Sequence, residues 1–156
     1  MKRDRFLMVI LGTIALLVVL AVILFFVRQE PQEYRSTDIP EGVVWNYVLA
    51  LQEGDYHQAY AYLQEVENKP DFTGFQQTFL QNEMMISRTA VQLGDANITA
   101  ESARIDVMVI HTNNDPFNRS WDENATALLI RQDEEWRIAS MPYPYWGWDW
   151  YIIEKR

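Results

Sequence analysis

The stretch VVWNYVLALQEGDYHQAYAYL (43–63) carries two apolar patterns of helical spacing, separated by one break. In its first half, apolar residues recur at intervals of three and four positions and so share one helix face: Val44, Tyr47, Val48 and Leu51. Gly54-Asp55 interrupts the pattern, and glycine is the residue that most often ends a helix. The spacing therefore predicts two consecutive amphipathic helices within residues 41–65.

Further along the chain, the apolar period changes from helical spacing to alternation. Phenylalanines at helical spacing predict a third helix over residues 72–85. Alternation then predicts four strands, at residues 87–93, 96–112, 124–132 and 136–141. Gly94-Asp95 is expected to end the first strand, and Asp133-Glu134-Glu135 to turn the last two into a hairpin. Helices followed by antiparallel strands predict the α+β class.

Three segments resemble the nuclear-transport-factor-two-like superfamily, whose members have a cone-shaped, cystatin-like α+β fold. They are the helix pair 43–63, the helix DFTGFQQTF (71–79) and the closing hairpin ALLIRQDEEWRIAS (127–140), and the resemblance covers about residues 40–141. It implies a curved sheet wrapped around a long helix, with an apolar cavity at the open end. The superfamily includes isomerases and dehydratases as well as binding and assembly domains, so the fold does not choose the function. Within it, the chain looks most like small membrane-anchored bacterial members.

The first thirty residues contain an apolar segment long enough to cross a membrane. Phe6 to Val27 is a run of 22 residues without a charge, and a helix of that length spans roughly 33 Å. A cleaved signal peptide has a shorter apolar run followed by small residues, whereas this run ends in Leu24-Phe25-Phe26-Val27-Arg28. We therefore expect an uncleaved, single-pass transmembrane helix that contacts the lipid bilayer through residues 6–27.

Basic residues on either side of this segment predict its orientation. Lys2, Arg3 and Arg5 precede it closely, and Arg28 and Arg35 follow it more sparsely. Because basic residues favour the cytoplasmic side, the N-terminus is predicted to be cytoplasmic and the domain extracytoplasmic, at the cell membrane. The expected organisation is a cytoplasmic tip (1–5), a transmembrane helix (6–27), a polar tether (28–40), a cone-like domain (41–141) and an aromatic tail (142–156).

The composition argues against several classes of protein. The chain has no cysteine and only two histidines, which excludes a disulfide scaffold and leaves no recurrent metal-ligand spacing. From Ser36 onward there are 8 basic and 19 acidic residues, a balance that argues against binding nucleic acid. A glycine-rich phosphate loop is also absent from the sequence, so no metal and no cofactor are predicted.

Asp106 and His111 are the two candidates for catalytic chemistry. Asp106 interrupts an apolar strand on the face of Met108, where a desolvated carboxylate could act as a base. His111 ends the same strand on the face of Val109, where it would lie at the rim of a cone cavity. Each residue also fits a structural role, Asp106 on a solvated outer face of the sheet and His111 at the sheet edge.

The tail, residues 142–156, is unusually aromatic. Six of its rings are candidates for a binding surface: Tyr143, Tyr145, Trp146, Trp148, Trp150 and Tyr151. Aromatic rings are favoured at protein interfaces and at the headgroup level of membranes. Alternatively, the rings fold back to cover the sheet or to plug the cavity. A contact surface predicts that deleting the tail leaves stability nearly unchanged, whereas a packed tail predicts a large loss.

These features predict a non-enzymatic, membrane-anchored binding or assembly module outside the cytoplasm, with a protein or a small apolar molecule as partner. One alternative is a small-molecule enzyme of isomerase or dehydratase type, with Asp106 as base and His111 as donor. That alternative requires both side chains to converge on one spot in the cavity. A second alternative is a structural envelope protein. The sequence does not predict the oligomeric state.

Overall fold

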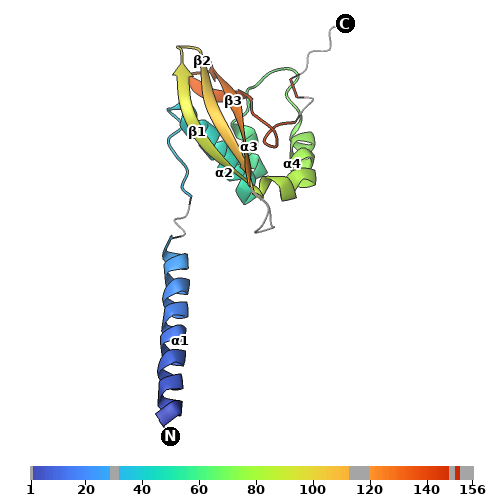
Figure 1. Cartoon of the computed structure of the whole chain (residues 1–156). Helices are drawn as coiled ribbons and strands as arrows, with labels where there is room; N and C mark the ends of the chain where they lie inside the picture. The colour runs from blue at the N-terminus through green and yellow to red at the C-terminus, as the bar shows by residue number, and fades with distance from the viewer. Residues whose placement is uncertain (1, 29–31, 113–119, 148–149, 152–156) are drawn as a thin grey trace. The chain divides into compact units, whose positions relative to one another are not determined.

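The computed structural model describes residues 2–28, 32–112, 120–147 and 150–151 of the 156-residue chain. The chain divides into two compact units, Met1–Glu33 and Tyr34–Arg156. Both units are drawn in Figure 1, and each is described by itself.

The first unit is built on one long helix, α1 (Lys2–Arg28). Its segment Phe6–Leu24 has a mean hydropathy of 3.2 and is not buried against any described part of the chain. The hydroxyl of Thr13 donates to the carbonyl of Val9 at 2.9 Å, so this polar group is satisfied within the helix, as an apolar solvent requires. By length and composition, α1 can span a membrane, in agreement with the sequence analysis.

The second unit opens with α2 (Pro40–Glu53). Proline stands at its start, where the fixed φ of the ring suits the first turn and the missing N–H is not needed. Gly54 ends it in the left-handed conformation, with φ 76°, and its backbone N–H caps the last turn. The predicted stop at Gly54-Asp55 is therefore confirmed.

Two further helices begin at aspartate caps. The Asp55 side chain accepts from the N–H of Gln58 at 3.0 Å at the start of α3 (Tyr56–Ala61). The Asp71 side chain accepts from the N–H of Gly74 at 2.7 Å at the start of α4 (Phe72–Ile86). The second and third predicted helices are thus present.

Four strands follow the helices, namely β1 (Thr89–Ile98), β2 (Ser102–His111), β3 (Trp121–Gln132) and β4 (Glu135–Ser140). Each pairs antiparallel with the next, in the order β1-β2-β3-β4. The free edge of β4 is covered by the segment after α3, because Gln64 donates to the carbonyl of Ile138 and Ile138 donates to that of Tyr62. The predicted α+β order is confirmed.

Three predicted strand boundaries are wrong. Gly94-Asp95 does not end the first strand but forms an irregularity between Leu93 and Ala96, after which β1 continues to Ile98. The chain turns instead at residues 99–101, where the Thr99 hydroxyl accepts from the N–H of Ser102 at 3.0 Å. The predicted strand 96–112 is thus the end of β1, a turn and β2. In addition, β3 begins at Trp121 rather than at residue 124, because Trp121 pairs with His111.

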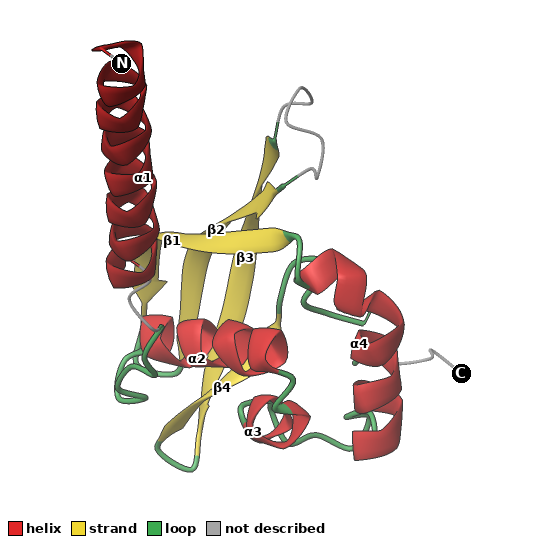
Figure 2. Ribbon diagram, turned by 90° about the horizontal axis from the view of Figure 1, so that it is seen from below, coloured by secondary structure: helices red, strands yellow, loops and turns green. Residues whose placement is uncertain are grey.

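The sheet has a covered inner face and an open outer face. The inward residues of β2 are buried, namely Ala103, Ile105, Val107 and Val109. Arg104 and Asp106 alternate with them and are exposed. Figure 2 shows α2 lying across the inner face, and its Val44 and Tyr47 are fully buried in the core. The alternation read from the sequence is confirmed, and the helices decide which face is inner.

Part of the predicted tether belongs to the domain. The side chain of Asn46, only 1% exposed, accepts from the N–H of Arg35 at 2.7 Å and donates to its carbonyl at 2.8 Å. The hydroxyl of Tyr34 donates to Glu53 at 2.8 Å. A Cβ at Gly42 would lie 1.9 Å from the carbonyl oxygen of Ser36, so only glycine admits this close approach. We call residues 34–37 the junction segment, and the domain begins there rather than at residue 41.

We expect Asn46→Ala to lower the free energy of unfolding by about 1–3 kcal/mol, because it leaves both backbone groups of Arg35 without their partners. Urea melts of the variant and the wild type measure the change. Gln77→Ala, at an exposed position of α4, is the control and is expected to stay within about 0.5 kcal/mol. Equal stability of all three proteins would mean that the junction segment is not held to α2.

Candidate functional site

The aromatic tail returns to the core after β4. Tyr145 is fully buried and Trp150 is 8% exposed, and both belong to the main apolar cluster together with residues of α2 and α4. Met141, the residue just before the tail, is buried as well. The tail therefore contributes to the interior of the domain.

Tyr145 ties the tail to α2 and to the start of β1. Its hydroxyl lies 2.7 Å from the hydroxyl of Thr89, and its carbonyl accepts from the hydroxyl of Tyr47 at 2.9 Å. Burial raises the pKa of both phenols, and for Tyr145 the hydrogen bonds with Thr89 and Gln52 act in the opposite direction. Both tyrosines are thus held in their neutral form as buried hydrogen-bonding groups.

Trp150 fills the space next to α4. Its indole stacks on Phe75 with ring centroids 5.3 Å apart and meets Phe79 edge-on at 5.6 Å. Trp146 meets the indole edge-on, with ring centroids 5.0 Å apart. A Cβ at Gly147 would lie 2.3 Å from the indole, so glycine lets the backbone pass directly over the ring. The described side chains of the tail are therefore part of the apolar core beside α4.

The six predicted contact rings therefore have different environments. Tyr145 and Trp150 are buried and cannot form an exposed contact surface, because the domain itself covers them. Trp146 and Tyr151 are partly buried, and the hydroxyl of Tyr151 donates to the carbonyl of Gln64 at 2.8 Å. Tyr143 remains exposed. Trp148 lies outside the described residues.

The buried phenols make the domain sensitive to alkali. A folded-state pKa above the unfolded value gives stability that is complete below about pH 10 and is lost as the pH rises through the folded pKa. We therefore expect the unfolding free energy to fall above about pH 10, and to fall less steeply in Tyr145→Phe. Urea melts from pH 8 to 11 measure the slope, with Tyr143→Phe as the exposed control. Parallel slopes for all three proteins would contradict the assignment.

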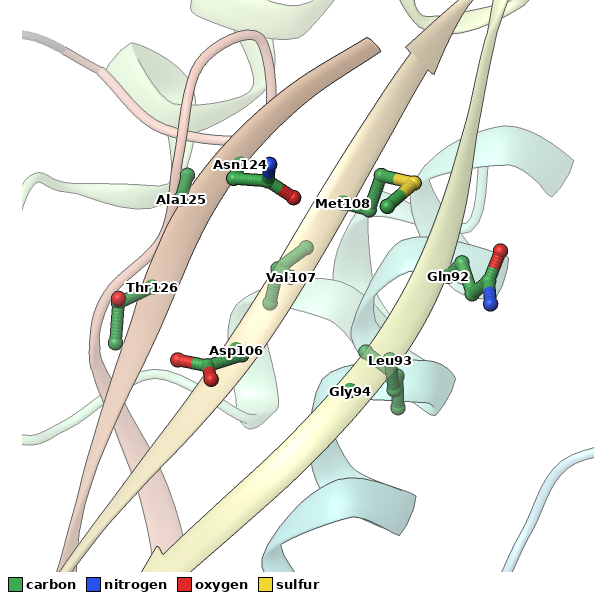
Figure 3. Close-up of a pocket in the computed structure, with 9 residues that line it drawn as sticks. All are labelled: Gln92, Leu93, Gly94, Asp106, Val107, Met108, Asn124, Ala125 and Thr126. Atoms are coloured by element: carbon green, nitrogen blue, oxygen red, sulfur yellow. The ribbon is translucent and has the colours of Figure 1, made fainter.

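Asp106 lies on the outer face of the sheet. It is exposed and helps to line a shallow hollow of about 330 Å³ that crosses β1, β2 and β3 (Figure 3). Gln92, Asn124 and Thr126 also line this hollow, so polar side chains lie beside Asp106 among apolar ones. The desolvation that would have favoured Asp106 as a base is absent, because the helices cover the opposite face.

His111 points to the other side of β2. Residues five apart on a strand face opposite sides, so His111 shares the side of Val107 and Val109, away from Asp106. Its imidazole stacks on the indole of Trp121 with ring centroids 3.8 Å apart. Its Nε2 is buried and has no hydrogen-bond partner among the described residues. Asp106 and His111 therefore do not converge on one spot.

The described part of the chain contains no cluster of side chains that could bind a metal ion. No three side chains of histidine, aspartate or glutamate gather there closely enough to hold an ion. The second histidine, His57, stacks on Phe72 with ring centroids 4.0 Å apart, as part of the contact between α3 and α4.

The comparisons with known proteins find a likeness in fold. No protein-family model matches the chain, and no curated protein matches it. A candidate NTF2-like transpeptidase from Campylobacter jejuni is 24% identical over 64% of this chain and 95% of its own, with a TM-score of 0.48. A SEC-C motif containing protein from Rhodopseudomonas palustris is 7% identical over 68% and 79%, with a TM-score of 0.52. A Nostoc punctiforme protein of unknown function with a cystatin-like fold is 11% identical over 63% and 81%, with a TM-score of 0.48.

The domain is similar to these cystatin-like and NTF2-like proteins in its order of helices and strands. Helices that precede a four-stranded antiparallel sheet and cover one of its faces are the arrangement that the resemblance implied. In this domain, the tail adds buried rings after the last strand. The likeness concerns fold, and the chemistry of the site has to be argued from this chain's own residues.

The sequence analysis did not single out Trp121. Its side chain is 54% exposed at the start of β3, and it holds His111 by stacking. The signal was its place three residues before the predicted strand 124–132. A tryptophan at the first position of a strand has neighbouring strand residues on only one side along the chain, so its ring is more exposed to solvent than that of a tryptophan in the middle of the strand.

Proposed function

We propose that the chain is a membrane-anchored, extracytoplasmic binding or assembly module without enzymatic activity, and that it contacts a protein partner through its exposed surface. The observation that carries the proposal is the filled interior. Tyr145 and Trp150 are packed into the apolar core, and each is held there by contacts with other core residues. A ligand in the interior would first have to displace them.

The enzyme alternative requires a base and a donor that lie close together, and Asp106 and His111 do not. A base and a donor have to lie within hydrogen-bond reach of the same substrate atom, and Asp106 and His111 face opposite sides of β2. The exposed position of Asp106 on the outer face of the sheet also favours a solvated surface carboxylate.

Charge indicates the kind of protein partner. From Ser36 onward the chain carries a net charge of −11. A charge of this size attracts a basic surface and speeds its encounter with the domain. We therefore propose a partner with a basic face, and association with it should weaken as salt is raised, because exposed charges are screened.

The anchor and the orientation can be tested in one protein, because the chain has no native cysteine. Ala100→Cys places a single thiol at an exposed position in the turn between β1 and β2. We expect the full-length variant to stay in the membrane after alkaline carbonate extraction, and a membrane-impermeant maleimide to label it in intact cells. Recovery in the soluble extract would overturn the anchor, and labelling only after permeabilisation would overturn the orientation.

The binding role needs a separate measurement. We expect chemical cross-linking of intact membranes to give a discrete higher-mass species that disappears when the membranes are first washed at high salt. A panel of small apolar compounds is expected to leave the melting temperature unchanged. A compound that raises it by several degrees would contradict the filled interior and favour a pocket binder.

A further inference from the structure

The hollow around Asp106, which we call the outer hollow, lies where an irregularity of β1 meets β2. The irregularity falls between Leu93 and Ala96, and Gly94 within it lies next to Asp106. A Cβ at Gly94 would lie 3.3 Å from the Cβ of Asp106, so a longer side chain at this position would cover the carboxylate. The glycine thus keeps Asp106 open to the outside.

Polar side chains surround Asp106 on the same face of the sheet, as Figure 3 shows. Asp106 pairs with Thr126 of β3. Met108, the next outward residue of β2, pairs with Gln92 of β1 and with Asn124 of β3. Directly paired residues have Cβ atoms about 4.5–5.5 Å apart, and outward neighbours along one strand are about 7 Å apart. One long side chain laid on this face can therefore reach all of these groups.

The polar atoms of the outer hollow are not used within the described part of the chain. No hydrogen bond there joins another group to the side chains that line the hollow, namely those of Gln92, Asp106, Asn124 and Thr126. Neither of the two ion pairs among the described residues involves Asp106. Together these side chains offer five acceptor oxygens, two of them on the carboxylate. A ligand can bind to them without first breaking bonds inside the domain.

The charge around the outer hollow favours a cation. Asp95 is exposed in the irregularity of β1, and Asp122 faces the same side further along β3. Arg104, two residues before Asp106, also faces this side and lines a separate hollow. Its single positive charge is outweighed by the three carboxylates of Asp95, Asp106 and Asp122, so the potential over the outer hollow is negative.

We propose that the outer hollow binds an arginine side chain of the protein partner. The guanidinium group carries a fixed positive charge and five N–H donors in one plane, and a carboxylate accepts two of these donors side by side. The five acceptor oxygens of the hollow match this set, whereas a lysine ammonium has only three donors. This inference rests on the basic partner of the proposed function and gives that partner a place of contact on the domain.

The size and the apolar part of the outer hollow agree with this occupant. Its volume of about 330 Å³ is at the lower end of ligand pockets, which measure about 300–1,000 Å³, so it suits a single side chain. Met108 lies among the polar residues, and its polarizable thioether is a surface on which the methylene groups of an arginine can pack.

Binding of a labelled peptide tests the site in the full chain. The protein is placed in nanodiscs of zwitterionic phosphatidylcholine, whose lipid has no net charge to attract a cationic peptide. Fluorescence anisotropy then measures its affinity for a fluorescein-labelled peptide of four Gly-Arg repeats. We expect this peptide to bind about tenfold more tightly than the matching lysine peptide, because only the guanidinium forms paired bonds to a carboxylate. The matching citrulline peptide, which has the shape of arginine without its charge, should show no binding.

Two substitutions in the outer hollow and one outside it assign the binding. Asp106→Asn should weaken the arginine peptide about tenfold and remove its advantage over lysine. Gly94→Ala should weaken it about threefold, because the added Cβ narrows the hollow beside Asp106. Glu67→Gln removes one exposed charge from the loop between α3 and α4 and should change the affinity by less than about twofold. Thermal melts show that each variant remains folded.

Three results with the peptides would overturn the site. Equal affinity of the wild type and Asp106→Asn for the arginine peptide would mean that the acidic surface as a whole binds it. Equal affinity of the wild type for the arginine and lysine peptides would contradict a guanidinium site. If Nα-acetylarginine amide bound as tightly as the peptide, the outer hollow would be a site for a small molecule and not a contact with a protein.

The same variants separate the site from the proposed function. We expect the cross-linked species of intact membranes to be lost in Asp106→Asn and kept in Glu67→Gln. A species that persists in Asp106→Asn would overturn the outer hollow as the place of contact and leave the partner intact. Absence of the species from wild-type membranes would overturn the proposed function itself.

Discussion

Deletion of residues 142–156 is expected to abolish cooperative folding of the domain. The deletion removes Tyr145 and Trp150, which are both buried in the core. Loss of one large buried aromatic side chain costs about 3–5 kcal/mol, so loss of two costs about 6 kcal/mol or more. Because the whole stability of a domain is about 5–15 kcal/mol, the truncated chain should be unfolded or close to it. Near-ultraviolet circular dichroism and thermal melts of the full and truncated chains in the same detergent measure this.

The exposed ring of the tail gives the control for that deletion. Tyr143→Ala keeps the rest of the tail and should change the unfolding free energy by less than about 0.5 kcal/mol. A truncated protein that melts like the wild type, and loses only its association with a partner, would show that the tail is a contact surface. The packed tail would then be wrong.

The helices and the faces of the strands could be predicted because they are local properties. The spacing of Val44 and Tyr47 along α2 fixes which side of that helix is apolar. Alternation along β2 fixes that Asp106 and Val107 face opposite sides, whatever surrounds them. Each inference needs only a short window of sequence, and each agrees with the structure.

The features that were missed depend on contacts between distant residues. Trp150 and Phe75 stack although the chain between them includes the whole sheet, so no window of sequence reports their contact. Likewise, the polar stretch after α1 looks like free tether until Asn46 supplies bonds to the backbone of Arg35. The irregularity at Gly94-Asp95 carries residues typical of a turn, and only pairing with β2 shows that the strand continues.

These distant contacts also determine which candidate residues remain for function. The alternation left open whether Asp106 or His111 would face a cavity. Once α2 covers the inner face, Asp106 is a solvated surface residue. His111 lies on the other face, where its ring stacks on the indole of Trp121. The tail then adds Tyr145 and Trp150 to the packed core. The surface is left as the place for an interaction, which is why the proposed function concerns exposed residues.

Trp150→Ala is expected to be the most damaging single substitution, with a loss of about 3–5 kcal/mol in the free energy of unfolding. The indole is 8% exposed and contacts three rings, those of Phe75, Phe79 and Trp146, so its removal leaves an apolar cavity that the surrounding side chains cannot close. Urea melts measure the loss. Trp121→Ala removes the same side chain from an exposed position and should stay within about 0.5 kcal/mol of the wild type.

Added indole shows whether Trp150→Ala leaves an open cavity in the core or destabilises the domain in another way. An apolar cavity with aromatic walls binds a ring of matching shape, and a ligand that binds only the folded state stabilises it by about 2.7 kcal/mol at a hundredfold excess over its Kd. Indole should therefore raise the melting temperature of Trp150→Ala and leave that of the wild type unchanged, because in the wild type Trp150 already occupies the site. A variant that is destabilised but does not respond to indole would mean that the core collapses around the missing ring. An equal response in both proteins would mean that indole binds elsewhere, and that the interior is not filled by the tail.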